Sequence, residues 1–266
     1  MSDTPHWALV TGACSGIGLE LARGLAARGH PLVITSNRCG QIEAVAERIT
    51  AEYGVAAQAI TMDLARPEAA ALLHEEIRRR GLQIEILVSN AGMFFFGEVA
   101  ETDPSKADAM LQLHVVTPSL LALYFGHDMR ERRSGHILFV SSASSFGDFP
   151  GIAFYGSSKK YLRGFAGASR EELRPWGVNV TCLAPGAVAT DLYDRGTRAV
   201  QVAARFRLLR DPEAVAGAAL RGMFRRRGLV LPGPGAKLMA VGSALAPSWL
   251  VRLARTHTHY LPQPRN

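Results

Sequence analysis

Short apolar runs alternate with longer amphipathic segments along most of the chain. The short runs predict buried strands, and the segments with apolar residues at helical spacing predict the helices that join them. We expect strands at Ala8–Val10, Leu32–Thr35, Ala57–Met62, Ile86–Ser89, His136–Ser141, Asn179–Leu183 and Leu229–Leu231. We expect helices at Ile17–Arg28, Gln41–Tyr53, Pro67–Arg80, Pro104–Arg132, Tyr155–Arg174 and Asp211–Arg226. This alternation predicts an α/β fold with a doubly wound, seven-stranded parallel sheet and helices on both faces.

The last part of the chain departs from this pattern. Residues 229–251 are almost wholly apolar apart from Lys237, which raises the question of a membrane span. Prolines 232, 234 and 247 interrupt the segment, and because each proline removes a backbone donor we expect no continuous spanning helix. We expect residues 1–232 to form a single domain and residues 233–266 to be an extension packed on or beside it. Contact of the extension with a membrane surface is the less favoured alternative.

The composition fits one globular domain. Of the 266 residues, 48% are hydrophobic and 20% are charged, a balance that excludes a disordered or fibrous chain. The three cysteines, Cys14, Cys39 and Cys182, are odd in number and widely spaced, so neither a disulfide framework nor a zinc site is expected. No secretory signal is readable at the N-terminus, and we expect a cytoplasmic protein.

The net charge of +7 comes from the end of the chain, because residues 195–266 hold 13 Lys or Arg against two Asp or Glu. Such a block can attract an anionic substrate, an acidic partner or an anionic membrane, but a solvated arginine-rich face is the favoured interpretation. No nucleic-acid-binding motif accompanies the charge, so we expect no nucleic-acid partner.

A glycine loop follows the first predicted strand directly. It reads Thr11-Gly12-Ala13-Cys14-Ser15-Gly16-Ile17-Gly18 and opens the first helix. Its spacing differs from GxGxxG, but the glycines still allow a tight turn, and the helix N-terminus presents free N–H groups to a pyrophosphate. A glycine turn without a ligand is the alternative. We predict that Gly12, Ser15, Gly16, Ile17 and Gly18 bind a dinucleotide.

Two further strand ends carry candidate cofactor contacts, because ligands of open α/β sheets bind at the carboxyl ends of the strands. Asp63-Leu64 follows the third strand, where a carboxylate can hold an adenine amino group, and Asn90-Ala91-Gly92 follows the fourth, where small residues leave room for a ribose. Taken singly, Asp63 also fits a helix cap and Asn90-Ala91-Gly92 a turn.

A serine, a tyrosine and a lysine form the candidate catalytic group. Tyr155 and Lys159 are four residues apart on a predicted helix, so they share one face. Ser142 closes the fifth predicted strand and can reach the same volume.

With these motifs and Pro185-Gly186 in order, the chain strongly resembles the short-chain dehydrogenase/reductase family from residue 7 to about residue 232. The resemblance implies a Rossmann-like domain that binds NAD(P) and oxidises alcohols or reduces carbonyls of small molecules. It also implies a homodimer or homotetramer, joined through the helices predicted at Pro104–Arg132 and Tyr155–Arg174.

By this resemblance Tyr155 is the general acid or base, Lys159 binds the nicotinamide ribose and lowers the tyrosine pKa, and Ser142 holds the carbonyl. Bringing a phenol from pKa ~10 to ~7 requires about 4 kcal/mol, which one ammonium at about 4 Å supplies at an effective dielectric of about 20. The site must therefore be shielded from solvent, or the positive nicotinamide must help to lower the tyrosine pKa. Further nicotinamide contacts are implied for Pro185, Gly186, Val188 and Thr190.

One residue departs from the family pattern. The long helix after the fourth strand usually carries an asparagine that holds a water in the proton relay, and here His114 occupies that position. Histidine donates and accepts hydrogen bonds and titrates near neutrality, so we hypothesise that His114 takes part in the relay. The alternative is an altered relay with slow turnover or an unusual substrate.

Cofactor choice depends on the end of the second strand, Ser36-Asn37-Arg38. It lacks the acidic residue that binds a ribose 2′-hydroxyl in NAD-specific relatives, whereas Asn37 leaves space and Arg38 can pair with a 2′-phosphate. NADP(H) is therefore favoured. NAD(H) is the alternative, since Ser15 rather than a basic residue precedes Gly16.

The predicted substrate is apolar or lipid-like. Met93-Phe94-Phe95-Phe96 and the arginine-rich segment from Asp191 to Arg210 suggest an apolar pocket with a cationic rim, although core or subunit packing also explains the phenylalanines. We predict an NADP(H)-dependent oxidoreductase that exchanges a hydride with a carbonyl or secondary alcohol. The alternative is a dinucleotide-binding sensor or scaffold with weak or no catalysis.

Overall fold

A seven-stranded parallel sheet forms the centre of the molecule in the computed structural model, which describes residues 6–38, 40–189, 210–247, 249 and 251. The strand order is β3-β2-β1-β4-β5-β6-β7, so the chain reverses direction across the sheet between β1 and β4. Such a switch point is where open α/β sheets bind ligands. The strands are β1 Trp7–Thr11, β2 Leu32–Ser36, β3 Ala57–Thr61, β4 Ile84–Ser89, β5 Gly135–Val140, β6 Val178–Leu183 and β7 Leu229–Val230.

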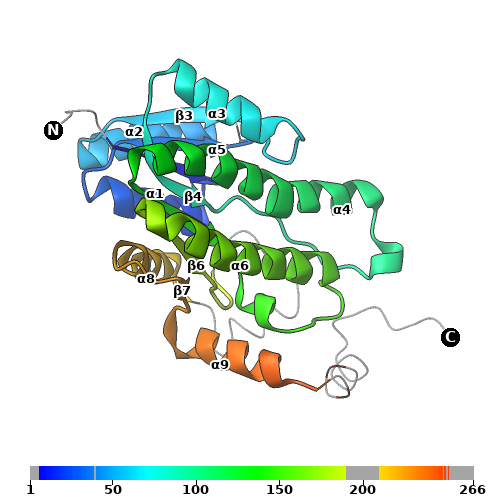
Figure 1. The fold of residues 1–266 in the computed structure, drawn as a ribbon. Helices are drawn as coiled ribbons and strands as arrows, with labels where there is room; N and C mark the ends of the chain where they lie inside the picture. The colour runs from blue at the N-terminus through cyan, green and yellow to red at the C-terminus, as the bar shows by residue number, and fades with distance from the viewer. Residues whose placement is uncertain (1–5, 39, 190–209, 248, 250, 252–266) are drawn as a thin grey trace.

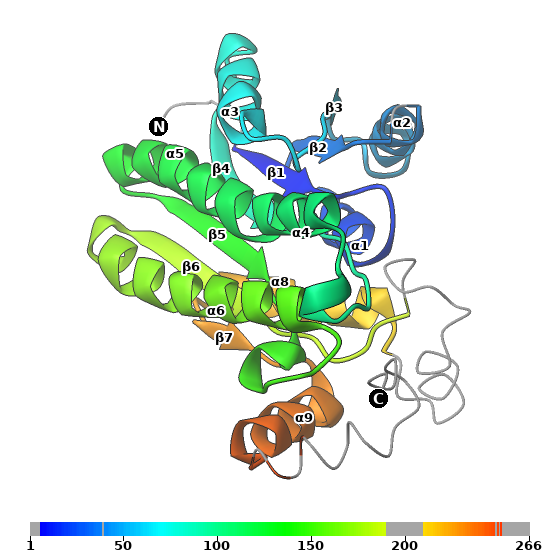
Figure 2. The same ribbon diagram turned by 90° about the vertical axis from the view of Figure 1, so that its right-hand side faces the viewer.

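Helices cover both faces of the sheet (Figures 1 and 2). Alternate strand residues enter the two halves of the core: Val10 packs with α1, α2 and α8, whereas Leu9 packs with α3, α5 and α6. The helices are α1 Gly16–Ala26, α2 Gln41–Tyr53, α3 Ala69–Arg79, α4 Pro104–Leu111, α5 Thr117–Arg132, α6 Ala153–Leu173, α8 Pro212–Phe224 and α9 Gly233–Leu245, with short 3₁₀ segments at Val99–Glu101, Ala143–Phe146 (η3) and Arg174–Trp176. The predicted doubly wound sheet is confirmed.

The helix predicted at Pro104–Arg132 is divided by a π-helical turn, η2, at Gln112–Val116. The N–H of Thr117 donates to the carbonyl of Gln112, five residues back. Pro118 has no N–H, so the carbonyl of His114 lacks its usual α-helical donor, and the wider turn accommodates this loss. The prediction of one uninterrupted helix was wrong at this point.

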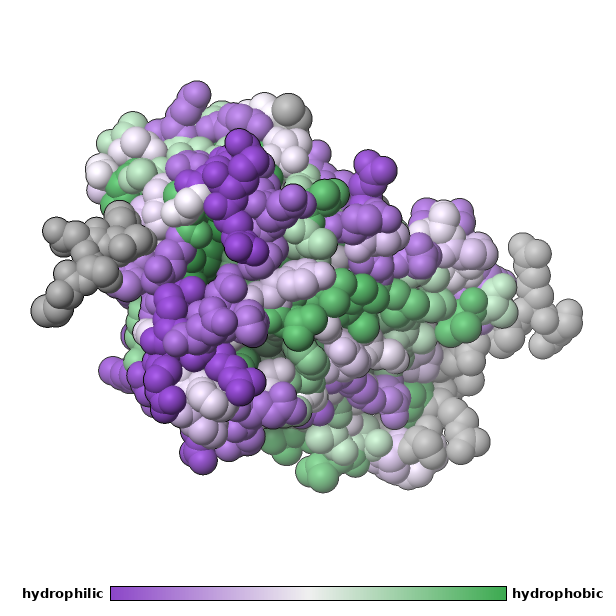
Figure 3. Space-filling model, turned by 45° about the horizontal axis from the view of Figure 1, so that its top comes forward, coloured by the Kyte–Doolittle hydropathy of each residue, from purple (hydrophilic) through white to green (hydrophobic). Residues whose placement is uncertain are grey.

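The segment from Pro104 to Arg132 is also long and apolar enough, by length and composition, to span a membrane. In this fold it packs on the sheet through Leu121, Phe125 and Met129, as a core helix does. Its outer face carries exposed Leu111, Val116 and Leu123, and hydrophobic residues gather in a band on this side of the molecule (Figure 3).

Helix α9 was not predicted, because its prolines were taken to break a helix. Pro234 lies in its first turn, where the missing N–H breaks no hydrogen bond, and Pro247 follows its end. The helix packs against η3 at the edge of the molecule beyond β7 (Figure 2). The domain boundary at residue 232 stays a prediction.

Candidate active site

A cavity of about 610 Å³ lies along the carboxyl ends of strands β1 to β6. Thr190 lies outside the described residues, as does the predicted rim up to residue 209. Every other predicted site residue lines the cavity: Gly12, Ser15, Gly16, Ile17, Gly18, Asn37, Arg38, Asp63, Leu64, Asn90, Ala91, Gly92, His114, Ser142, Tyr155, Lys159, Pro185, Gly186 and Val188.

The glycine loop forms a tight cradle at the start of α1. Gly12 has φ +66, and a Cβ added there would lie 2.8 Å from the Cα of Ala91. A Cβ on Gly18 would lie 2.2 Å from the carbonyl oxygen of Gly12, so neither position accepts a side chain. Ser15, the N-cap of α1, makes no side-chain capping bond among the described residues. The first-turn N–H groups are therefore available to an anionic group.

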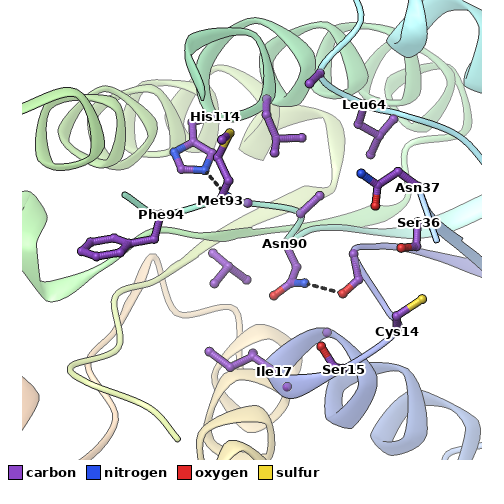
Figure 4. Close-up of a pocket in the computed structure, with 18 of the residues that line it drawn as sticks. Cys14, Ser15, Ile17, Ser36, Asn37, Leu64, Asn90, Met93, Phe94 and His114 are labelled. Carbon is purple, nitrogen blue, oxygen red and sulfur yellow. Dashed lines mark hydrogen bonds between the residues drawn. The ribbon is translucent and has the colours of Figure 1, made fainter. Parts of the chain in front are cut away.

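Asn90 ties this cradle to the end of β4 (Figure 4). Its Nδ2 donates to the carbonyls of Thr11 (2.9 Å) and Gly12 (3.1 Å). The Thr11 hydroxyl accepts the N–H groups of Asn90 and Ala91 at 2.9 and 3.0 Å. The Asn90 side chain therefore holds the glycine loop in place, while Ala91 and Gly92 line the cavity beside it.

Tyr155 and Lys159 lie on the buried face of α6. The Nζ of Lys159 donates to the carbonyl of Val140 at 3.0 Å and lies 5.7 Å from the centre of the Tyr155 ring. Burial lowers the pKa of Lys159 from 10.5 to about 8. The tyrosine ring is held by edge contacts with Phe94 and His114, whose ring centres lie 4.9 and 5.7 Å away. The structure thus shields the pair from solvent, as the tyrosine chemistry requires.

Ser144, which sequence reasoning missed, orients Ser142. The Oγ of Ser142 accepts the backbone N–H of Ser144 at 3.1 Å and its hydroxyl at 2.9 Å. These two bonds use both lone pairs of the Ser142 oxygen, so its own proton remains to be donated to a third group. The Ser-x-Ser spacing was the only sequence signal for Ser144.

His114 is 1% exposed, and both of its ring nitrogens are hydrogen-bonded. Nε2 accepts the backbone N–H of Met93 at 2.9 Å (Figure 4), and Nδ1 lies 3.0 Å from the Oγ of Ser158. Because Ser158 donates its own proton to the carbonyl of Tyr155, Nδ1 of His114 must be the donor to Ser158. The ring therefore joins η2 to the loop after β4 and to α6.

The ring of His114 is neutral, whereas the sequence predicted a histidine that titrates near neutral pH. Desolvation, with the positive charge of Lys159, lowers the pKa of His114 well below 6.5, and acceptance of the Met93 N–H requires the neutral ring. The expectation that His114 titrates near neutrality was therefore wrong. Its participation in a proton relay stays a prediction.

At the far end of the cavity, the end of β2 presents Ser36, Asn37 and Arg38. The nearby acid Glu43 directs its carboxylate to the N–H of Gly40 and the hydroxyl of Thr61, both at 2.6 Å. Asp63 lines the cavity while its Oδ1 accepts the N–H of Ala65 at 3.0 Å, so it also caps the turn that follows it.

The phenylalanines after β4 divide between the cavity and local packing. Phe94 lines the cavity next to Tyr155, whereas Phe95 packs against Phe154 with ring centres 6.4 Å apart. Phe96 packs edge-on against Phe94 at 4.8 Å and is 43% exposed. The predicted apolar wall is formed within the described residues mainly by Met93, Phe94 and Leu113.

A doubly wound sheet with a glycine cradle at its switch point and a buried Tyr-Lys pair defines a dinucleotide-dependent oxidoreductase. The short chain dehydrogenase family model matches residues 6–200, and the chain belongs to this family. It is therefore an NAD(P)-dependent oxidoreductase that acts on alcohol and carbonyl groups.

Individual relatives agree with this assignment. The chain is 33% identical over 193 residues to the uncharacterized oxidoreductase YmfI of Bacillus subtilis (72% of this chain, 78% of the relative) and 30% identical over 217 residues to dehydrogenase/reductase SDR family member 4 of Mus musculus (79% and 77%). Among solved structures, a short-chain dehydrogenase from Sphingobium yanoikuyae in complex with NADPH aligns with a TM-score of 0.80 and 26% identity, covering 98% of this chain and 99% of that one.

Proposed function

We propose that this protein exchanges a hydride between NADP(H) and the carbonyl or secondary alcohol of an apolar substrate, with Tyr155 as the general acid or base. The observation that carries the proposal is the buried Tyr155–Lys159 pair, which lines one cavity together with Ser142 and the glycine cradle. Nothing else in the described residues brings a proton donor, a cation and a phosphate cradle together.

The residues of the cradle fit a dinucleotide. The pyrophosphate would lie at the N-terminus of α1, against Gly12 and residues 15–18, where side chains are sterically excluded and N–H groups are available. Asp63, Leu64, Ala91 and Gly92 would line the adenosine and ribose, and residues 185–188 the nicotinamide. When bound, the nicotinamide supplies or accepts the hydride.

The chain itself handles the substrate oxygen. Ser142 donates its hydroxyl proton to that oxygen, because both lone pairs of its Oγ are occupied by Ser144. Tyr155 transfers its phenolic proton to the oxygen in reduction and removes a proton in oxidation. Lys159 favours the tyrosinate by charge, an effect that the buried site strengthens to about 4 kcal/mol if the ammonium lies about 4 Å from the phenolic oxygen.

The preference for NADP(H) is supported by Arg38 and by the engagement of Glu43. Arg38 lines the cavity at the end of β2, and the carboxylate of Glu43 is bound to Gly40 and Thr61 rather than left for a ribose hydroxyl. Arg38→Ala should raise KM for NADPH about tenfold or more and leave KM for NADH nearly unchanged. Equal catalytic efficiencies with the two cofactors in the unaltered protein would defeat the preference.

The preference for an apolar substrate is supported by Phe94, which lines the cavity at the tyrosine. One solved relative, 25% identical and with a TM-score of 0.76, is a bulky-bulky ketone specific alcohol dehydrogenase from Comamonas testosteroni. We therefore place bulky apolar ketones first among the substrates to be tested. Leu123 on α5 and Tyr161 on α6 are exposed, which supports a homo-oligomer joined through these helices. We also propose that the protein is cytoplasmic.

The test is NADPH binding followed by NADPH oxidation with aldehydes, bulky ketones, quinones and acyl substrates. Turnover that disappears in Tyr155→Phe while NADPH affinity is retained supports the proposal. Tight binding of NADPH without turnover on any of these substrates would indicate the sensor or scaffold instead.

A further inference from the structure

Helix α9 buries its small side chains and exposes its large apolar ones. Ala236 and Ala240 are 4% and 3% exposed, whereas Leu238 and Leu245 are both 76% exposed and Val241 is 58% exposed. A helix on the surface of a globular protein normally has the opposite arrangement, with its large apolar residues toward the core. Among the described residues, nothing covers the outer face of α9.

The orientation of α9 is determined by close contacts on its inner face. A Cβ added to Gly147, which follows η3, would lie 2.6 Å from the Cβ of Ser243. A Cβ added to Gly186 would lie 3.8 Å from Ala236. Larger side chains do not fit on this face, so α9 cannot rotate to bury its leucines without losing these contacts.

Three exposed apolar residues form one stripe along α9, defined here as Leu238, Val241 and Leu245. Their spacings of three and four residues place them on one side of a helix. The helix ends at Leu245, and Trp249, four residues further along the chain, is 62% exposed. Tryptophan at the end of an apolar stripe is typical of a helix that lies at a membrane–water interface.

The charge near the start of the stripe is positive. Arg210 lies against the first residue of α9, since a Cβ added to Gly233 would be 2.8 Å from its guanidinium carbon. The acid Asp148, which follows Gly147, is paired with Lys160. Lys237 directly precedes the stripe and is exposed. The N-terminal end of the stripe is thus flanked by the cations Arg210 and Lys237.

We propose that the stripe of α9 binds the surface of an anionic lipid bilayer. The apolar side chains enter the boundary between headgroups and acyl chains, Trp249 lies at headgroup level, and the flanking cations contact lipid phosphates. A second copy of the chain is the less suitable occupant, because a two-fold interface on this face would bring the two sets of cations together. The inference is independent of the proposed catalytic function.

The experiment is co-flotation of the full-length protein with vesicles of phosphatidylcholine alone and of phosphatidylcholine with 30% phosphatidylglycerol. The unaltered protein should bind the anionic vesicles, and added salt should weaken the binding. The double variant Leu238→Glu/Leu245→Glu should bind at least about tenfold more weakly. Leu72→Glu is the matched control: Leu72 is 52% exposed on α3, far from α9, and its replacement should leave binding unchanged.

Tryptophan fluorescence gives a second measurement. Trp7 is buried in the core and Trp176 packs beneath Arg130, so a blue shift on adding anionic vesicles should come from Trp249 and should disappear in Trp249→Phe. The proposal is overturned if the protein floats with neither vesicle, if Leu72→Glu weakens binding as much as the double variant, or if the double variant abolishes a dimer in solution and leaves vesicle binding unchanged.

Discussion

The two edges of the sheet both contain buried or half-buried ionisable side chains, but they hold them differently. At the carboxyl edge both ring nitrogens of His114 and the Nζ of Lys159 are hydrogen-bonded to groups around the cavity. At the amino edge His30 and His136 pack against the ring of Phe224, with ring centres 6.0 and 5.6 Å away. The Nδ1 of His136 is buried and has no hydrogen-bond partner among the described residues.

A lowered pKa does not distinguish the two edges. Desolvation is the largest cause of the lowered pKa of His30, His114 and His136 alike. What differs is the hydrogen bonding: the ring nitrogens of His114 and the Nζ of Lys159 are hydrogen-bonded to residues around the cavity, whereas the rings of His30 and His136 make mostly aromatic contacts. Burial of an ionisable group therefore marks a site only where its polar atoms are directed to a common volume.

Lys159→Met should show the largest effect, with opposite signs for activity and stability. Below pH 8 the folded protein holds an ammonium that its surroundings disfavour by about 3 kcal/mol relative to the unfolded chain. Methionine fills a similar volume without charge. The free energy of unfolding in urea at pH 7 should therefore rise by up to about 3 kcal/mol, while kcat/KM falls at least about 100-fold.

The pH dependence of stability tests the predicted effect of Lys159 a second time. Because the folded-state pKa of Lys159 is the lower one, the unfolded chain binds more protons between about pH 8 and pH 10.5, and this residue's contribution to stability should rise over that window. Lys159→Met should lack that rise. A Lys159→Met protein that is less stable at pH 7 would show that the hydrogen bond to Val140 outweighs desolvation.

A comparison of His114→Asn with His136→Asn tests whether catalysis depends on the carboxyl edge of the sheet and not on the amino edge. Asparagine is too short to keep both the Met93 and the Ser158 contact, so kcat/KM should fall about tenfold at position 114 and stay unchanged at position 136. Because the ring is already neutral, His114 can serve the relay only by positioning its partners, so the shape of the pH–rate profile should survive His114→Asn. A shift of the acid limb would show that the ring itself titrates during turnover.

The sequence was sufficient to predict the strands and most of the residues that line the cavity, because those residues lie in short motifs at the ends of strands. It did not predict the contacts that depend on tertiary structure. Ser144 becomes important only when η3 turns it back toward Ser142, and Ser158 only when η2 brings His114 to α6. The outward stripe of α9 could not be read either, since the apolar composition of this segment does not show which face is buried.

Ser144→Ala, also at the carboxyl edge, is expected to lower kcat/KM less than His114→Asn does. Loss of its hydroxyl leaves one lone pair of Ser142 free, so the Ser142 proton is less well directed and kcat/KM should fall about three- to tenfold, mostly in kcat. Ser145→Ala is the matched control, because Ser145 is fully buried next to it and its Oγ has no partner among the described residues. Equal losses in the two variants would remove Ser144 from the site.

The smallest effect is expected at the amino edge, from His136→Phe. The lowered pKa of His136 means that below about pH 6.5 the unfolded chain binds a proton that the folded protein does not, so stability falls as the pH falls. One such group contributes at most about 1.4 kcal/mol per pH unit, and phenylalanine removes that contribution together with the unpartnered Nδ1. Urea denaturation between pH 7 and pH 5 should therefore show a shallower loss of stability in His136→Phe, with kcat/KM unchanged. An equally steep loss would assign the acid sensitivity to His30 and His114, and a fall in kcat/KM would show that the amino edge is coupled to the cavity after all.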